Sequence, residues 1–154
     1  MTTSTIAIGD TLPRLDLTLP DGTAVSVDDI AVAPATLIYF MRTSTCPACH
    51  HHLRLLERSH VNGVETSAQT IVVVPGDATA AAAVVSRHPL FAGRVVASET
   101  AHAAVGLFSK AGLQRSGGLV IDASGRVTQS HFGTIPTSAF DLAAATSALA
   151  DLAR

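Results

Sequence analysis

The stretch TLIYFMRTSTCPACHHHLRLL, residues 36–56, runs from an apolar segment through a Cys-Pro-Ala-Cys motif into a helical pattern. Residues 35–41 are almost continuously apolar and follow Pro34, which is typical of a short buried strand in the middle of a sheet. A helix is expected to begin at the cysteines, because Pro47 suits the first helical position, where its missing N–H costs nothing. The sequence therefore predicts a strand, a loop and a helix, with both cysteines of the chain at the start of the helix.

Outward from this stretch, short strands and helices alternate along the chain of 154 residues. Apolar and polar residues alternate over residues 15–27 on either side of Asp21 and Gly22, which predicts a β-hairpin near the N-terminus. The other expected elements are strands at 70–74 and 94–97, helices at 77–88 and 99–108, a strand-turn-strand unit at 117–130 and a C-terminal helix within 137–154. This order predicts one domain, residues 1–154, of the α/β class with a central sheet flanked by helices.

Composition and charge limit the classes of function. Apolar residues make up 47% of the chain and charged residues 14%, which is typical of a globular protein. The formal net charge of -2 offers no basic surface for a nucleic acid or an anionic membrane. The N-terminus lacks the pattern of a secretory signal, and no stretch reaches the roughly 18 to 20 apolar residues of a membrane-spanning helix. We therefore expect a cytoplasmic protein with no nucleic-acid or membrane partner, in which C-x-x-C points to redox or metal chemistry.

The two cysteines are expected to differ in reactivity. Cys46 would lie among unpaired N–H groups at the positive end of the helix dipole, which favours its thiolate. Such positions bring the pKa of a cysteine from about 8.5 to between about 3.5 and 7.5. Cys49, Leu53 and Leu56 share one face of the helix, so that Cys49 points inward while Cys46 opens at the tip. This arrangement suits an attacking thiol and a second thiol that closes on it.

The same residues fit three other interpretations. Cys-Pro-Ala-Cys-His is the attachment pattern of c-type haem, but a buried strand that leads directly into the motif leaves no open space for a haem. Zinc needs four ligands and the motif supplies two, while His50, His51 and His52 project about 100° apart around a helix. In the third interpretation the cysteines are small buried residues without a role. We expect no cofactor and no metal, and we interpret the histidines as a polar helix edge near the thiols, where a histidine can also tune a thiol pKa.

In its order of residues the chain resembles the thioredoxin-like superfamily and, within it, the peroxiredoxin-like family of alkyl hydroperoxide reductases and thiol-specific antioxidants. The resemblance covers most of the chain, and it implies a thioredoxin-like fold: a central mixed sheet flanked by helices, with an N-terminal hairpin. The segments that carry it are GDTLPRLDLTLPDGTAVSVDDI (9–30), the stretch 36–56, TIVVVPGD (70–77), VVASETAHAAVGLF (95–108) and GGLVIDASGRV (117–127).

The resemblance assigns roles to the residues of the motif. Thr43 and Cys46 keep the T-x-x-C half of the family's P-x-x-x-T-x-x-C motif, and Tyr39 stands where the family has the proline. By resemblance Thr43 would hydrogen-bond a peroxide and Cys46 would attack it. Cys49 would be the resolving thiol, which closes a local disulfide with Cys46.

The family also carries an arginine just before the strand that is LVID in this chain. Arg115 is the candidate, displaced by one residue, and a bulge at Gly117 and Gly118 is expected to absorb the slip. Arg42 is the second cationic candidate, because cations beside a reactive cysteine favour its thiolate.

Three functions follow from this resemblance. The leading one is a thiol peroxidase that reduces hydrogen peroxide or organic hydroperoxides, with a thioredoxin-like dithiol reductant as partner and a homodimer as the assembly common in the family. The second is a thioredoxin-type oxidoreductase acting on protein disulfides, although the residues ahead of LVID, Arg115 to Gly118, lack the proline of that group. The third is a thioredoxin-fold binding module whose cysteines are inert or hold a metal.

Overall fold

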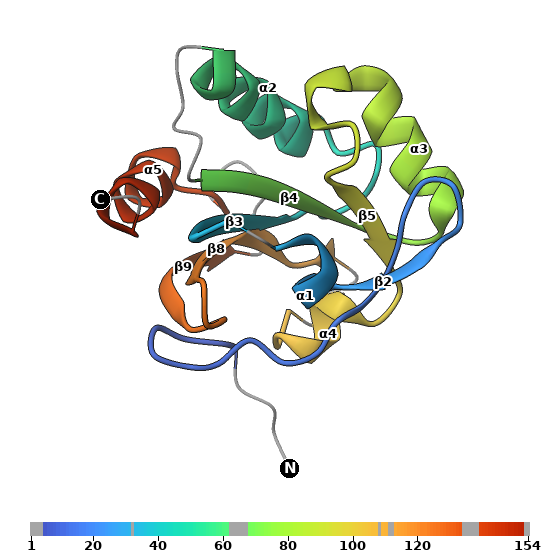
Figure 1. Ribbon diagram of the computed structural model, residues 1–154. Coiled ribbons are helices and arrows are strands. Elements are labelled where there is room, and N and C mark those ends of the chain that lie inside the picture. Colours follow the sequence, from blue (N-terminus) through green and yellow to red (C-terminus); the bar gives the residue numbers. More distant parts are fainter. Residues whose placement is uncertain are drawn as a thin grey trace.

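The computed structural model describes residues 5–31, 33–61, 68–107, 109–110, 113–133 and 139–152 and places helices on both faces of a central sheet (Figure 1). Its seven strands are β1 Asp16–Thr18, β2 Ala24–Ser26, β3 Ala35–Phe40, β4 Ala68–Pro75, β5 Val95–Ser98, β8 Ser116–Asp122 and β9 Val127–Gly133, and a separate ribbon holds β6 Ser109–Lys110 and β7 Leu113–Gln114. The helices are α1 Val27–Ile30, α2 Pro47–Val61, α3 Ala78–Arg87, α4 Ala101–Ala104 and α5 Leu142–Leu152, with a 3-10 turn η1 at Pro89–Phe91.

The large sheet is mixed, with β3 and β4 near its middle. Its strand order is β2-β1-β5-β4-β3-β8-β9. Strand β3 pairs in parallel with β4 and antiparallel with β8, and β4 pairs in parallel with β5. All six residues of β3 are buried, as its apolar sequence predicts for a strand covered on both faces. The central mixed sheet flanked by helices is thereby confirmed.

Side chains of β3 alternate between two apolar clusters, one on each face of the sheet. Leu37 and Tyr39 pack into a cluster with residues of α2, α3 and α5, which cover one face (Figure 1). Ile38 and Phe40 pack into a second cluster with residues of α1 and α4 on the opposite face. Since successive residues of a strand point to opposite faces, the same short run builds both halves of the core. Both cysteines belong to the first cluster, together with Tyr39.

The N-terminal hairpin is confirmed, with β1 and β2 antiparallel and Leu17 opposite Val25. Its outgoing strand ends earlier than expected, because Ser26 and Asp29 form a capping box that starts α1. The expected helix at 99–108 is reduced to α4, and the chain turns at Gly106 with a φ of 84°. Residue 108 and residues 137–138 and 153–154 of the expected helices lie outside the described part of the chain.

Strand β8 does not have the bulge that was expected at Gly117 and Gly118. Gly117 and Gly118 keep regular register with β3 and β9, and the irregularity lies between Val120 and Ile121. Gly117 has a φ of +148°, and a Cβ there would lie 2.2 Å from the His131 carbonyl oxygen. The glycine therefore serves the close approach of β9 rather than a bulge.

No helix in the described part of the chain is both long and apolar enough to cross a membrane.

Candidate active site

The loop between β3 and α2 delivers both cysteines to one end of the sheet. Met41 continues the strand, with its N–H donating to the Val73 carbonyl at 2.9 Å. Helix α2 begins at Pro47 as predicted, and the first helical hydrogen bond joins the His50 N–H to the Cys46 carbonyl at 3.0 Å. Cys46 is therefore the residue immediately before the helix, next to the first backbone N–H groups of α2, which have no partner within the helix.

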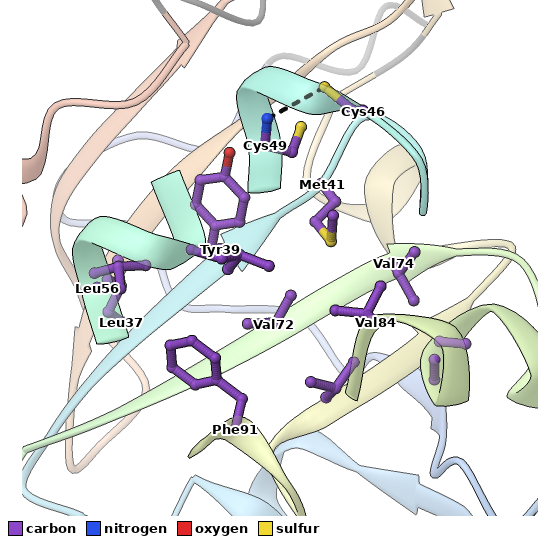
Figure 2. Close-up of a cluster of buried hydrophobic side chains, with 14 of the residues drawn as sticks. Leu37, Tyr39, Met41, Cys46, Cys49, Leu56, Val72, Val74, Val84 and Phe91 are labelled. Atoms are coloured by element: carbon purple, nitrogen blue, oxygen red, sulfur yellow. Dashed lines mark hydrogen bonds between the residues drawn. The ribbon is translucent and has the colours of Figure 1, made fainter. Parts of the chain in front are cut away.

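Cys46 is more enclosed than the sequence suggested, with 2% of the residue exposed, and the expectation that it opens at the tip is wrong. Its Sγ accepts the Cys49 N–H at 3.3 Å (Figure 2). Burial is the largest influence on the Cys46 pKa and raises it, but hydrogen bonds from Cys49 and the charge and hydrogen bond of Arg42 together bring the pKa below its ordinary value. The geometry thus favours a Cys46 thiolate.

Cys49 points inward as predicted and is fully buried. Its Sγ accepts the Arg42 backbone N–H at 3.3 Å. Burial, followed by the hydrogen bond and charge of Cys46, raises the pKa of Cys49 to about 12. Both cysteines are free. The structure therefore places a thiol whose pKa is lowered next to one whose pKa is raised.

The two arginines occupy different places. Arg42 lies in the cysteine loop and contributes to the lowered pKa of Cys46. Arg115 lies at the same end of the sheet, two residues before Gly117, which pairs with Phe40, and its Nη1 donates to the Thr5 hydroxyl at 3.1 Å. Thr43 also lies in the loop: its carbonyl accepts the Cys46 N–H at 3.4 Å, and its hydroxyl is 3.5 Å from that of Thr45.

Replacing Arg42 with Ala is expected to raise the pKa of Cys46, because the variant loses the guanidinium whose hydrogen bond and charge favour the thiolate. Arg115→Ala serves as the matched control, and we expect a smaller shift because its guanidinium binds Thr5. Thiolate absorbance followed against pH measures both. Equal shifts in the two variants would contradict this division of roles.

The histidine run is not the polar helix edge that we expected. His51 is exposed, but His50 is 0% exposed and His52 is 6% exposed. His50 Nε2 donates to the Ser44 carbonyl at 2.7 Å, and His50 Nδ1 lies 2.7 Å from His88 Nε2. The two imidazoles stack with centroids 4.9 Å apart. The run therefore ties α2 to the cysteine loop and to the end of α3.

Glu57 completes this cluster by bonding to Nδ1 of His88. Burial lowers the pKa of His50, so its ring is neutral, with the proton on the Nε2 that faces the Ser44 carbonyl. His88 Nε2 then donates to His50, while His88 Nδ1 bonds to Glu57. The cluster thus links the cysteine loop, α2 and the end of α3 through three hydrogen bonds.

Truncating Glu57 to Ala is expected to lower the free energy of unfolding by about 2 kcal/mol, because a buried imidazole N–H loses its partner. Glu57→Gln can still hydrogen-bond to His88 and should recover about half of the loss. Glu99→Ala, at an exposed glutamate, should stay within about 0.5 kcal/mol of the parent. Urea unfolding measures all three, and an Ala variant as stable as the parent would show that the cluster does not stabilise the fold.

A further buried histidine anchors the end of β3. His102 Nε2 donates to the Met41 carbonyl at 2.7 Å, and the ring lies edge-on to Phe40. Burial lowers the pKa of His102 to about 4, against an opposing effect of the bond to Met41. The ring is thus neutral in the folded state at neutral pH.

Acid is expected to destabilise the protein through His102. The folded pKa of about 4 lies below the unfolded value of 6.5, so the stabilisation is complete above about pH 6.5 and is lost as the pH falls toward 4. The loss is on the order of 3 kcal/mol. Urea midpoints measured across this range should fall less steeply for His102→Gln than for the parent, while the exposed control His51→Gln follows the parent. Parallel curves for His102→Gln and the parent would contradict the assignment.

Several of these residues were missed by reasoning from the sequence. Tyr39 Oη lies 2.7 Å from His52 Nδ1, and Tyr39 points toward Cys49 (Figure 2). His88 and Glu57 come from separate elements, and no local pattern joins them to His50. The only signal in the sequence was the histidine run itself. Three consecutive helix positions project about 100° apart, so at least one of these histidines has to face the sheet when the helix covers it. Among the described residues no group of three His, Cys, Asp or Glu side chains could hold a metal ion.

Comparisons with known proteins agree with this geometry at the level of the fold. No family model matches the sequence, and no curated protein matches it. A peroxiredoxin-like protein from Aquifex aeolicus is similar with a TM-score of 0.80 and 14% identity, over 98% of this chain and 90% of that one. A thiol peroxidase from Chromobacterium violaceum gives a TM-score of 0.77 at 15% identity, over 96% and 88% of the two chains.

The thioredoxin domain of a thiol-disulfide oxidoreductase from Bacteroides vulgatus is also similar, with a TM-score of 0.64 and 12% identity, over 82% of this chain and 89% of that one. The chain therefore has a thioredoxin-like fold in the form that peroxiredoxin-like structures take, as the sequence predicted. At identities of 12% to 15%, these likenesses are likenesses of fold.

Proposed function

We propose that this protein is a thiol peroxidase that reduces hydrogen peroxide or organic hydroperoxides. The Cys46 thiolate attacks the terminal oxygen of the hydroperoxide, the O–O bond breaks, and water or an alcohol leaves after taking up a proton. Cys46 is then a sulfenic acid. Cys49 attacks its sulfur, water leaves, and a Cys46–Cys49 disulfide forms, which an external dithiol of the thioredoxin class reduces.

The observation that carries this proposal is the pairing of a thiol whose pKa is lowered with an enclosed reaction site. Of the two cysteines, Cys46 is the one whose pKa is lowered, and it is 2% exposed. The disulfide of a protein must align directly with such a sulfur, which its burial disfavours. We assign Arg42 to hold the thiolate and Thr43 to bind the peroxide from the same loop. Arg115 is proposed as a secondary cation at this end of the sheet.

A thiol-disulfide oxidoreductase is the second candidate, because Cys46 and Cys49 would form the same redox pair on a protein disulfide. The comparison of rates decides between the two. We expect the second-order rate constant for reduced protein with hydrogen peroxide or cumene hydroperoxide to exceed that with a disulfide-bonded peptide by at least about 100-fold, given the burial of Cys46. A faster reaction with the peptide disulfide would favour the second candidate.

A further inference from the structure

Tyr39 lies between the resolving thiol and a buried histidine. It comes from β3 and is completely buried. Its hydroxyl points toward Cys49 and lowers the pKa of that thiol by hydrogen bonding to it, although burial and Cys46 raise that pKa by more (Figure 2). On its other side the hydroxyl is 2.7 Å from Nδ1 of His52 on α2. The hydroxyl oxygen therefore lies between the Cys49 sulfur and an imidazole, and its single proton can be donated to either of them.

Cys49 must lose its proton in order to attack Cys46, because a thiol attacks as its thiolate. Burial is the largest cause that raises the pKa of Cys49 to about 12, and it persists when Cys46 is oxidised, so Cys49 stays mostly protonated at neutral pH. The backbone N–H of Arg42 donates to Cys49 Sγ at 3.3 Å, which helps the thiolate but does not take up its proton. A base in contact with the thiol would remove the need for prior ionisation.

We propose that Tyr39 and His52 carry away the proton of Cys49 when it attacks Cys46, with the Tyr39 hydroxyl as relay and His52 Nδ1 as acceptor. This step rests on the proposed function for its sulfenic acid. The same proton must leave if Cys49 instead attacks a mixed disulfide at Cys46.

The atoms and electrons of the step balance. The Cys49 sulfur gives an electron pair to the Cys46 sulfur, an S–S bond forms, and the S–O bond of the sulfenic acid breaks. Cys49 is oxidised and Cys46 is reduced. The thiol proton passes to the Tyr39 oxygen as the Tyr39 proton passes to His52, which becomes an imidazolium. The departing hydroxide takes a proton from solvent and His52 releases one to solvent, so that one water is formed overall.

His52 has the protonation state that the acceptor needs. Burial is the main cause that lowers its pKa, followed by the charge of its neighbour His51, so the ring is neutral at neutral pH. The groups that face it are Tyr39 from β3, His51 on its own helix, and the uncharged ring of Phe140 ahead of α5, 5.4 Å away between centroids. Tyr39 is suited to pass a proton rather than to hold a charge, because burial raises its pKa far above the neutral range.

The relay is tested by stopped-flow measurement of reduced protein mixed with hydrogen peroxide. The first phase, sulfenic acid formation, scales with peroxide, and the second, disulfide formation, does not. Tyr39→Phe removes the relay atom, and His52→Asn keeps a hydrogen-bond acceptor near the place of Nδ1 but removes its basicity. We expect the second phase to slow about 100-fold in both variants, with the first phase within about twofold of the parent. An unchanged second phase in both would overturn the proposal.

A pH profile separates a proton relay from a structural role. In the parent the second phase should be independent of pH above the lowered pKa of His52 and should fall below it. In both variants it should instead rise about tenfold per pH unit between about pH 6 and 9, because only ionised Cys49 then reacts. His51→Asn controls for the loss of a neighbouring histidine, and Phe140→Leu controls for packing on the pair. In both, the second phase should stay independent of pH above the pKa of His52, and in His51→Asn the point at which it begins to fall should move to higher pH, because the charge of His51 no longer lowers that pKa. Variants that are slow at every pH but keep the parent's profile would show a structural role only.

An aromatic disulfide reagent distinguishes failure of the relay from failure of the proposed function. The reagent forms a mixed disulfide at Cys46 and releases one chromophore, and attack by Cys49 releases a second one without any peroxide. If the parent gives no peroxide phase, the proposed function fails, but the second release still tests Tyr39 and His52. The relay predicts that this release slows in both variants by the same factor as disulfide formation, and a release as fast as in the parent would refute it.

Discussion

A Cys46→Ser variant is expected to lose at least about 10³-fold in the rate of peroxide reduction, because a serine hydroxyl does not ionise near neutral pH and cannot replace the thiolate. The substitution exchanges sulfur for oxygen at a site that is 2% exposed, so we expect the free energy of unfolding to change by about 1 kcal/mol. Peroxide consumption in the presence of excess dithiol measures the first quantity, and urea unfolding measures the second.

Cys49→Ser is the matched control for this loss. Its Cys46 should still be oxidised once, at a rate close to that of the parent, because Cys49 takes part only after the sulfenic acid has formed. Turnover that survives in Cys46→Ser and disappears in Cys49→Ser would reverse the assignment of the two thiols.

Replacing Gly117 with Ala is expected to lower the free energy of unfolding by more than about 3 kcal/mol. The added Cβ would lie 2.2 Å from the His131 carbonyl oxygen and 2.6 Å from Cδ1 of Phe132, and the φ of +148° is unfavourable for any side chain. The contact is with the backbone of β9, which cannot rotate away. Because β8 pairs with β3 at Phe40, the strain also reaches the strand that leads to the cysteine loop. Urea unfolding should show a lowered midpoint or an unfolded protein.

Two other glycines separate the causes of this loss. Gly125 has a φ of +85°, but a Cβ added there would meet no atom within 4 Å. Gly125→Ala should therefore lower the free energy of unfolding by only about 1 kcal/mol, for the backbone conformation alone. Gly118→Ala has an ordinary φ and meets side-chain atoms of Phe140 and Leu37 at 3.0 to 3.3 Å, which can move. If Gly117→Ala were no worse than Gly125→Ala, the close approach of β9 would not be what requires the glycine.

The fold followed from the sequence where local patterns and burial agree. The apolar run at β3, the helix start at Pro47 and the hairpin around Asp21 all depend on neighbouring residues. The expected helix at 77–88 is found as α3, with Asp77 as the residue before it, whose side chain accepts the Ala80 N–H. Short elements such as α1 and α4 were missed or overextended, because a capping box or a single glycine decides them and tertiary contacts set their length.

The candidate site was less predictable, because its contacts join distant elements. The inward direction of Cys49 came from the spacing of Leu53 and Leu56, but the enclosure of Cys46 depends on how the whole loop packs. Spacing along α2 could not show that His50 meets His88, which is 38 residues away. Nor could it show that His52 meets Tyr39 across the face of the sheet.

Whether Cys46 is a peroxide-reducing thiol is decided by the intact mass of reduced Cys49→Ser protein after one equivalent of hydrogen peroxide, with the rate followed by stopped flow. We predict a fast gain of one oxygen atom, located at Cys46, and a slower gain when Arg42→Ala is added. A protein whose mass stays unchanged, or which gains oxygen no faster than a free thiol in solution, would contradict this prediction.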